Sequence, residues 1–129
     1  MKSPELQDLT DEKLAECFKL ASFQEAEDMN NLKYYRKAHE KLKSVAEEFR
    51  RRGPEARRAL VPLLNCQDNS RIMSAVAQCR LNAANELLAI EPARARATLE
   101  ELANSVTQYQ MALARQTLRV LNDGTFKPT

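Results

Sequence analysis

His39 is the only histidine in the chain, so it is the only side chain of the type that ordinarily exchanges a proton near neutral pH. It follows Tyr35 by four residues and Leu32 by seven, which places it at the edge of an apolar helical stripe. No serine or cysteine near it in the sequence is an evident nucleophile. We therefore interpret His39 as a residue at the boundary of the core and predict that the chain is not an enzyme.

Carboxylates and thiols give no stronger chemical signal. The pairs Glu47–Glu48 and Glu100–Glu101 are adjacent, and adjacent helical residues point about 100° apart, which indicates solvated surface. The three cysteines form no CxxC pair, and with one histidine they cannot supply the close ligand set of a structural zinc site. We predict no metal and no cofactor. We expect Cys17 and Cys79 in the core and Cys66 in an exposed loop.

Tyrosines and arginines offer binding chemistry instead. Tyr34 and Tyr35 stand beside Lys33, Arg36 and Lys37, a composition that could stack bases or form a protein hot spot. We expect Tyr35 in the core and Tyr34 on the surface. Arg50–Arg52, Arg57 and Arg58 place five arginines within nine positions. They could bind phosphate or an acidic partner, but cations at a helix C-terminus also complement its dipole, and we prefer this interpretation.

Composition limits the function classes. The chain has 129 residues, a net charge of +2, two glycines and no tryptophan. Each half carries only one more basic than acidic side chain, so nucleic-acid binding is not favoured. No window approaches a membrane span and no apolar segment follows the N-terminus, and the odd, sparse cysteines suit a reducing compartment. We expect a cytoplasmic protein without a membrane partner.

Apolar periodicity and capping residues predict six helices. Thr10 is a good N-cap, Gly53 a good C′ residue and Pro54 a good first helical residue, while Pro62 should kink the helix that contains it. Gly124 marks the last C-cap, with Phe126 folding back. The expected helices are 11–27, 31–52, 54–64, 70–90, 93–104 and 106–122. They form one domain over 1–129, with tails at 1–9 and 125–129.

Several segments resemble HEAT-type repeats. Residues 53–65 (GPEARRALVPLLN) look like the first helix of such a repeat, and residues 80–84 (RLNAA) with 87–92 (LLAIEP) look like the second. With residues 9–14, 117–118 and 124–128, they are similar to an uncharacterised bacterial HEAT-like family, a domain of unknown function. The resemblance implies an all-α, short right-handed α-solenoid of three antiparallel helix pairs. Residues 66–79 are longer than the link that usually precedes the RLNAA segment, which indicates either a loop insertion or an extended helix.

The same resemblance implies a function, because some relatives look like immunity partners of secreted bacterial toxins. We expect a protein-binding module, most simply an immunity protein that occludes a cognate toxin. The alternatives are a general adaptor or, less favoured, a nucleic-acid-handling enzyme on a HEAT-like scaffold. Acidic patches at Asp8–Glu16 or Glu25–Asp28 could meet a basic toxin. If the second helix of each pair lines the concave face, the contact residues are Tyr34, Arg36, Lys37, Glu40, Gln78, Asn82, Asn85, Glu86, Arg115 and Arg119.

Overall fold

The computed structural model describes residues 5–129, and every regular element within them is helical. This confirms the all-α class. Residues 1–4 of the expected N-terminal tail lie outside the described part. There are six α-helices and two 3-10 helices: η1 (Leu6–Asp8), α1 (Asp11–Glu27), α2 (Leu32–Arg52), α3 (Pro54–Arg57), η2 (Arg58–Asn65), α4 (Met73–Leu87), α5 (Pro92–Leu102) and α6 (Gln108–Asn122).

Local capping fixes several helix ends where the sequence predicts them. The Thr10 hydroxyl accepts a hydrogen bond from the backbone N–H of Lys13 at 3.2 Å, which satisfies one free donor at the start of α1. Gly53 ends α2 with φ +107°, a conformation that a Cβ disfavours. The backbone N–H of Phe126 donates to the carbonyl of Val120 at 3.1 Å, which closes the end of α6. These bonds explain why the helix boundaries follow local sequence.

The segment after Gly53 differs from the single kinked α-helix expected for 54–64. Only Pro54–Arg57 is α-helical, and the chain then tightens into the 3-10 helix η2, which contains Pro62. Proline lacks an N–H, and its ring collides with the carbonyl four residues earlier in an α-helix. The turn preceding Pro62 therefore adopts the tighter 3-10 geometry.

The helix predicted for residues 70–90 also begins later in the structure than expected. Residues 66–72 form a loop, in which an Asp68 carboxylate oxygen accepts from the backbone N–H of Ser70 at 2.9 Å, and α4 begins at Met73. Such side-chain bonds compete with helix formation. Ile72 and Met73, at the start of α4, are 55% and 66% exposed. The first part of the long link, residues 66–72, is therefore a loop, and its second part, residues 73–79, belongs to α4.

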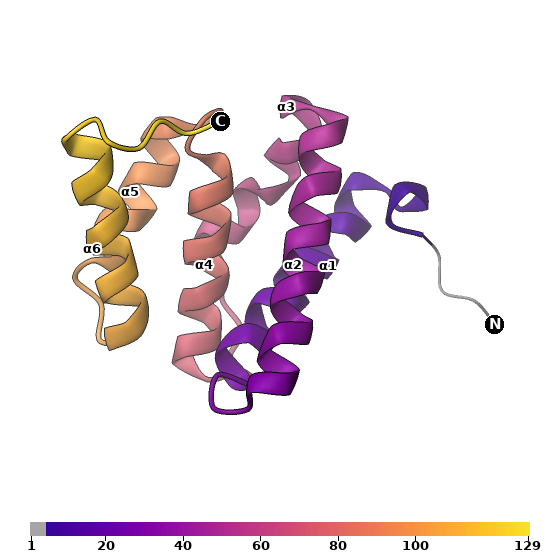
Figure 1. Cartoon of the computed structure of the whole chain (residues 1–129), viewed down its shortest axis with the longest axis horizontal. Coiled ribbons are helices and arrows are strands. Elements are labelled where there is room, and N and C mark those ends of the chain that lie inside the picture. Colours follow the sequence, from indigo (N-terminus) through magenta and orange to yellow (C-terminus); the bar gives the residue numbers. More distant parts are fainter. Residues whose placement is uncertain (1–4) are drawn as a thin grey trace.

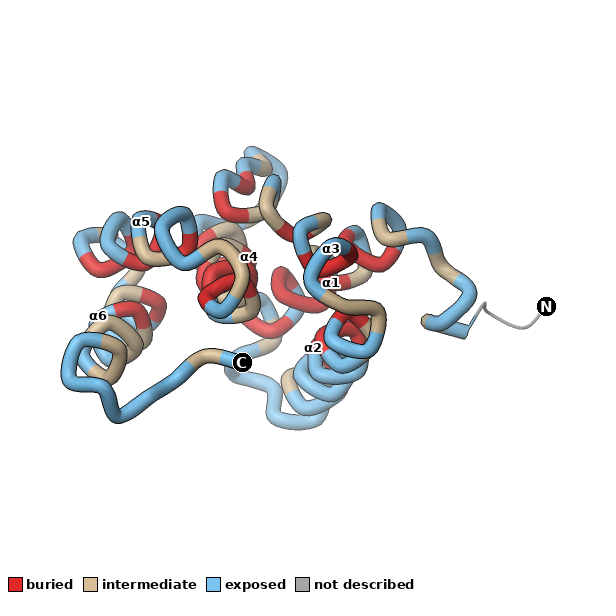
Figure 2. The backbone as a smooth tube through the Cα atoms, turned by 90° about the horizontal axis from the view of Figure 1, so that it is seen from above, coloured by how far each residue is buried: buried red, intermediate tan, exposed pale blue. Residues whose placement is uncertain are grey.

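Helix α4 lies at the centre of the packing. It contacts α1, η2, α5 and α6, while α1 packs on α2 and α5 packs on α6. Figure 1 shows α4 between these two outer pairs, and the N-terminal ends of α2, α4 and α6 at the same end of the molecule. Figure 2 shows buried positions on the sides of the helices that face one another. No helix within residues 5–129 is long and apolar enough to cross a membrane.

The apolar core has two parts. The larger cluster joins all the main helices and includes Phe18, Phe49 and Leu99. A smaller, separate cluster contains Phe23, Ala26, Cys66, Ala75 and Cys79. Burial of Cys79 confirms the prediction for that thiol. The prediction of an exposed Cys66 is wrong, because the loop before α4 folds back onto this cluster, and Cys17 is only partly buried.

Candidate functional site

The first half of α2 presents a cation-rich surface. Its exposed charged side chains include one carboxylate, Glu40, and five cations. We call the five cations the α2 basic face: Lys33, Arg36, Lys37, Lys41 and Lys43. Among the described residues, none of these six groups forms an ion pair or side-chain hydrogen bond. Figure 2 shows the outward side of α2 as a run of exposed positions. Four predicted contact residues, Tyr34, Arg36, Lys37 and Glu40, therefore lie together on free surface.

A shallow hollow runs beside this face. It has a volume of about 600 Å³ and lies between α1 and α2. Tyr34, Lys37 and Glu40 line its α2 side, and Gln24 and Asp28 line its α1 side. Tyr34 is 53% exposed, so its ring is available to a partner, as its sequence position predicts.

A buried polar network supports α2 from behind. Glu25 of α1 is almost fully buried, and one of its carboxylate oxygens lies 2.8 Å from Nδ1 of His39. Its other oxygen accepts from the Asn82 amide at 2.8 Å, and the same amide nitrogen donates to the Ser22 hydroxyl at 3.0 Å. The network thus connects α2, α1 and α4.

Tyr35 and His39 stack on the surface of this network. Their ring centroids are 6.0 Å apart and their planes differ by 10°. Tyr35 is half-buried, not fully buried as expected, and burial together with the nearby Glu25 carboxylate raises the pKa of its hydroxyl. Glu25 and His39 form a carboxylate–imidazole pair. No described hydroxyl or thiol hydrogen-bonds to His39, so the pair has no nucleophile to activate.

The network continues into α6 through Gln78. The Gln78 amide donates to Asn82 at 3.0 Å, and its carbonyl oxygen accepts from the buried Gln110 at 3.0 Å. Gln78 is only 7% exposed. The surface position that we expected for Gln78 is therefore wrong, because its side chain links α4 to α6 within the interior.

A small groove joins the remaining α4 candidates to α2. It has a volume of about 270 Å³, and His39, Arg50, Asn82, Asn85 and Glu86 are among its lining residues. Asn82 is partly withdrawn into the buried network, whereas Asn85 is exposed. Glu86 accepts from Arg50 at 2.9 Å, so this carboxylate is occupied within the chain.

The α6 candidates lie apart from this groove. Arg115 and Arg119 line an open depression on α6, and Figure 2 shows α6 and α2 on opposite sides of α4. The Arg115 guanidinium donates to the carbonyl of Ala103 at 2.8 Å. The structure thus places the α2 candidates beside the hollow between α1 and α2 and the α4 candidates at a separate groove between α2 and α4. The two α6 arginines lie apart from both.

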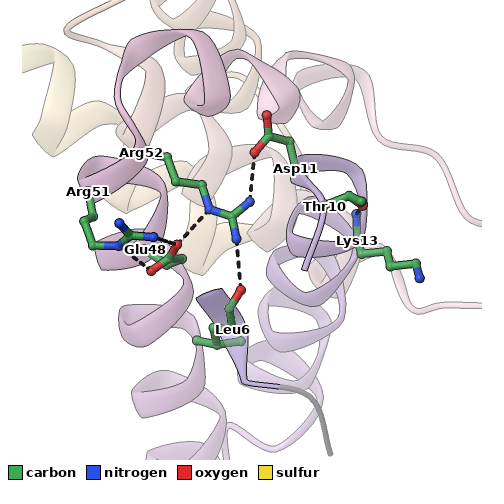
Figure 3. Close-up of polar contacts among 7 residues, drawn as sticks. All are labelled: Leu6, Thr10, Asp11, Lys13, Glu48, Arg51 and Arg52. Carbon is green, nitrogen blue, oxygen red and sulfur yellow. Dashed lines mark hydrogen bonds and ion pairs between the residues drawn. The ribbon is translucent and has the colours of Figure 1, made fainter. Parts of the chain in front are cut away.

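The five arginines between residues 50 and 58, which we call the arginine cluster, bind partners within the chain. Figure 3 shows Arg52 between Glu48, Asp11 and the carbonyl of Leu6, at 2.7, 2.9 and 2.9 Å. Arg51 also donates to Glu48, and the hydrogen bonds from Arg51 and Arg52 lower the pKa of this carboxyl from 4.5 to about 2.

The other three arginines are likewise occupied. Arg50 pairs with Glu86, and Arg58 pairs with Glu91 at 3.3 Å. Arg57 is buried and donates to backbone carbonyls of Glu86 and Thr129. All five arginines therefore have partners inside the chain, and a free phosphate-binding cluster does not result. Asp11 is likewise paired, which removes one carboxylate from the first expected acidic patch.

Sequence reasoning missed two features. Glu25 was expected in an acidic surface patch but is buried; its spacing of seven from Phe18 and four from Ala21 could have placed it on the apolar stripe of α1. The second feature is an apolar end, which we define by the exposed residues around the N-termini of α2, α4 and α6: Met29, Leu32, Ile72, Met73, Val106 and Tyr109. No signal in the sequence marked these side chains as exposed.

The described residues offer no metal centre. Within residues 5–129, no group of three or more His, Cys, Asp or Glu side chains could hold a metal ion. The fold and surface define a small all-α protein whose distinctive feature is an unpaired basic helix face next to exposed apolar side chains.

The chain belongs to the DUF2019 family, a domain of unknown function, whose model matches residues 12–122. This confirms the expectation of an uncharacterised family. The crystal structure of the protein RPA1889 from Rhodopseudomonas palustris CGA009 is similar, with a TM-score of 0.86 and 27% identity. The similarity covers 98% of this chain and 100% of that one. No curated protein matches the chain.

Proposed function

We propose that the chain is a protein-binding module that uses the α2 basic face to bind an acidic surface of its partner. The observation that carries this proposal is that five exposed cations on one helix lack any partner within the described chain, whereas the arginines at its C-terminal end are all paired. Exposed charge of one sign attracts a partner of the opposite sign and accelerates association.

The neighbouring apolar side chains add binding energy to this charge. Leu32, which belongs to the apolar end, and Tyr34 are 61% and 53% exposed on the same helix. A tyrosine beside arginine and lysine is a typical composition of interface hot spots. Exposed apolar side chains at one end of the molecule are typical of an interaction surface. The partner therefore offers acidic groups around an apolar patch.

The proposed architecture is a short right-handed HEAT-like α-solenoid. Its three pairs are α1 with α2, α3–η2 with α4, and α5 with α6. The contacts within each pair, and those of α4 with both outer pairs, support this arrangement. In such a stack each pair buries one side against the next and leaves an extended surface for binding.

The particular partner that we propose is a cognate toxin, which the chain neutralises by occlusion. The family resemblance and small size motivate this immunity function. A basic α2 face fits an acidic toxin surface better than the basic surface of a nuclease toxin. A general adaptor with an unknown host partner would use the same surface, and only the identity of the partner separates the two.

Nucleic-acid binding is the rival from another class. Tyr34 among cations is the observation that favours it, since aromatic rings stack on bases. If the chain binds single-stranded RNA or DNA, the logarithm of its affinity should fall steeply and linearly with the logarithm of the salt concentration. Fluorescence anisotropy with labelled 20-mers between 50 and 300 mM salt tests this. Micromolar binding with a steep salt slope would replace the protein-binding proposal.

Affinity capture with matched variants tests the proposal. The bait proteins are the wild type, the charge reversal Arg36→Glu with Lys37→Glu, and a control reversal of equal charge, Lys13→Glu with Arg94→Glu, at exposed positions on α1 and α5. We expect a stoichiometric partner with the wild type and the control. The α2 variant should lose at least about tenfold in affinity, or about 1.4 kcal/mol. Equal loss in both variants would contradict the α2 assignment.

Co-expression separates an immunity protein from an adaptor. The captured partner is expressed alone and together with the wild type or the α2 variant. An immunity protein rescues growth from a partner that is toxic alone, and the α2 variant fails to rescue. A partner that is harmless alone indicates an adaptor.

A further inference from the structure

Two thiols from different segments meet in the smaller apolar cluster. Cys66 ends η2 at the start of the loop, and Cys79 lies in the second turn of α4. Both belong to the cluster formed with Phe23, Ala26 and Ala75. Both are free thiols. The fold therefore places a dithiol at the junction of the loop with α1 and α4.

The two cysteines differ in their exposure, since Cys66 is 9% exposed and Cys79 is 0% exposed. Cys66 lines an open groove of about 760 Å³ between the 66–72 loop, α4 and the end of α5. Cys79 is completely buried and does not line the groove. A small reagent in the groove therefore meets Cys66 first, and Cys79 lies behind it.

Charges around the pair favour ionisation of the outer thiol. Interaction with the Cys79 thiol lowers the pKa of Cys66, and the cations Lys19 and Arg80 act in the same direction, against the effects of burial and of the Asp68 carboxylate. Interaction with the Cys66 thiol and burial both raise the pKa of Cys79. Of the two thiols, Cys66 is therefore the one that loses its proton more readily.

We propose that Cys66 and Cys79 form a redox-active dithiol in which Cys66 reacts with hydroperoxides that enter the groove and Cys79 resolves the product to an intramolecular disulfide. This site is independent of the α2 basic face. It assigns two different roles to the cysteines: attack from the groove for Cys66 and resolution from the interior for Cys79.

The reaction balances in two steps. The Cys66 thiolate attacks one oxygen of the hydroperoxide, the O–O bond breaks, and the other oxygen leaves and takes a proton as water or an alcohol. Cys66 is then a sulfenic acid. Cys79 attacks its sulfur, the S–O bond breaks, and the hydroxide leaves with the Cys79 proton as water. Two thiols and one hydroperoxide thus yield one disulfide, one water and one water or alcohol.

The test counts thiols in the folded wild type after treatment with hydrogen peroxide. Cys17 serves as an internal control, because it packs partly against the larger core cluster and has no thiol neighbour in the smaller one. We expect free thiols to fall from three to one per chain, with a mass loss of 2 Da on a monomer. Peptide mapping under non-reducing conditions should join the peptides of Cys66 and Cys79, and a dithiol reductant should restore three thiols.

Variants then separate the two roles. Cys66→Ser should abolish disulfide formation. Cys79→Ala should stop the reaction at a sulfenic acid on Cys66 that a dimedone probe labels, and Cys17→Ser should react as the wild type does. Far-UV circular dichroism checks that each variant is folded. The thiol count on the wild type tests the proposal even if a variant does not fold. Three free thiols after a tenfold excess of peroxide, or a disulfide that includes Cys17 or a second chain, would overturn the proposal.

Discussion

The substitution Asn82→Ala tests whether the buried network holds the helices together. The Asn82 amide nitrogen donates to Glu25 at 2.8 Å and to Ser22 at 3.0 Å, and its oxygen accepts from Gln78 at 3.0 Å. Ser22 and Glu25 are 0% and 4% exposed. Truncation therefore removes a hydrogen bond from the Ser22 hydroxyl, from one carboxylate oxygen of Glu25 and from the Gln78 amide, while Glu25 keeps its contact with His39.

The magnitude follows from the number and type of these bonds. A hydrogen bond to a charged group contributes about 1.5–3 kcal/mol, and the two neutral bonds contribute about 1 kcal/mol each. Alanine has a higher helix propensity than asparagine, which returns about 0.5 kcal/mol. We expect Asn82→Ala to lower the free energy of unfolding by about 3–4.5 kcal/mol, a large share of the stability of a small domain.

Urea unfolding followed by circular dichroism measures this change, and Asn85→Ala is the matched control. Asn85 lies on the same helix, is exposed and forms no side-chain hydrogen bond among the described residues. The control gains the same helix propensity and should stay within about 0.5 kcal/mol of the wild type. A difference of less than about 1 kcal/mol between the two variants would refute the reasoning, because the network would then contribute no more than exposed surface does.

Three further substitutions test the fold. Leu99→Ala at a fully buried position should cost about 2–5 kcal/mol in urea unfolding through lost burial and a residual cavity; a cost below about 1 kcal/mol would contradict its place in the core. Gly53→Ala should cost about 1–3 kcal/mol, because φ +107° with ψ 177° suits only glycine, and unchanged stability would show another conformation there. The Glu48 pKa is lowered to about 2 by Arg51 and Arg52, so its contribution is complete above the ordinary value near 4.5 and is lost as the pH falls. The stability advantage of the wild type over Glu48→Gln should therefore be constant above about pH 5.5 and decline between about pH 5 and 2, and an advantage independent of pH would exclude this ion pair.

Local sequence predicts most of the helices. The ends of α1, α2, α5 and α6 fall within two residues of their expected positions, because caps such as Thr10 and Gly53 act on their own backbone neighbourhood. The errors occur where two local signals compete. Pro62 converts an expected α-helix to 3-10 geometry, and Asp68 stabilises a loop where apolar periodicity predicts a helix.

The candidate surface could be predicted only in part. Tyr34, Arg36, Lys37 and Glu40 share the free surface of one helix, because their relative positions follow from helical spacing alone. The α6 arginines do not join them, because α4 separates the two helices. Spacing within a helix says nothing about which other helix lies beside it.

The sequence by itself determined the all-α class, the helix-forming segments and the exposed positions on α2, since each depends on contacts within a few residues. Tertiary structure alone decided which polar groups are buried and which charges are free. Arg52 pairs with Asp11 across 41 positions, and Asn82 bonds to Glu25 across 57. The free energy of a buried polar group or an ion pair depends on a partner from another helix. For that reason the paired arginine cluster and the unpaired α2 basic face could be distinguished only in the folded chain.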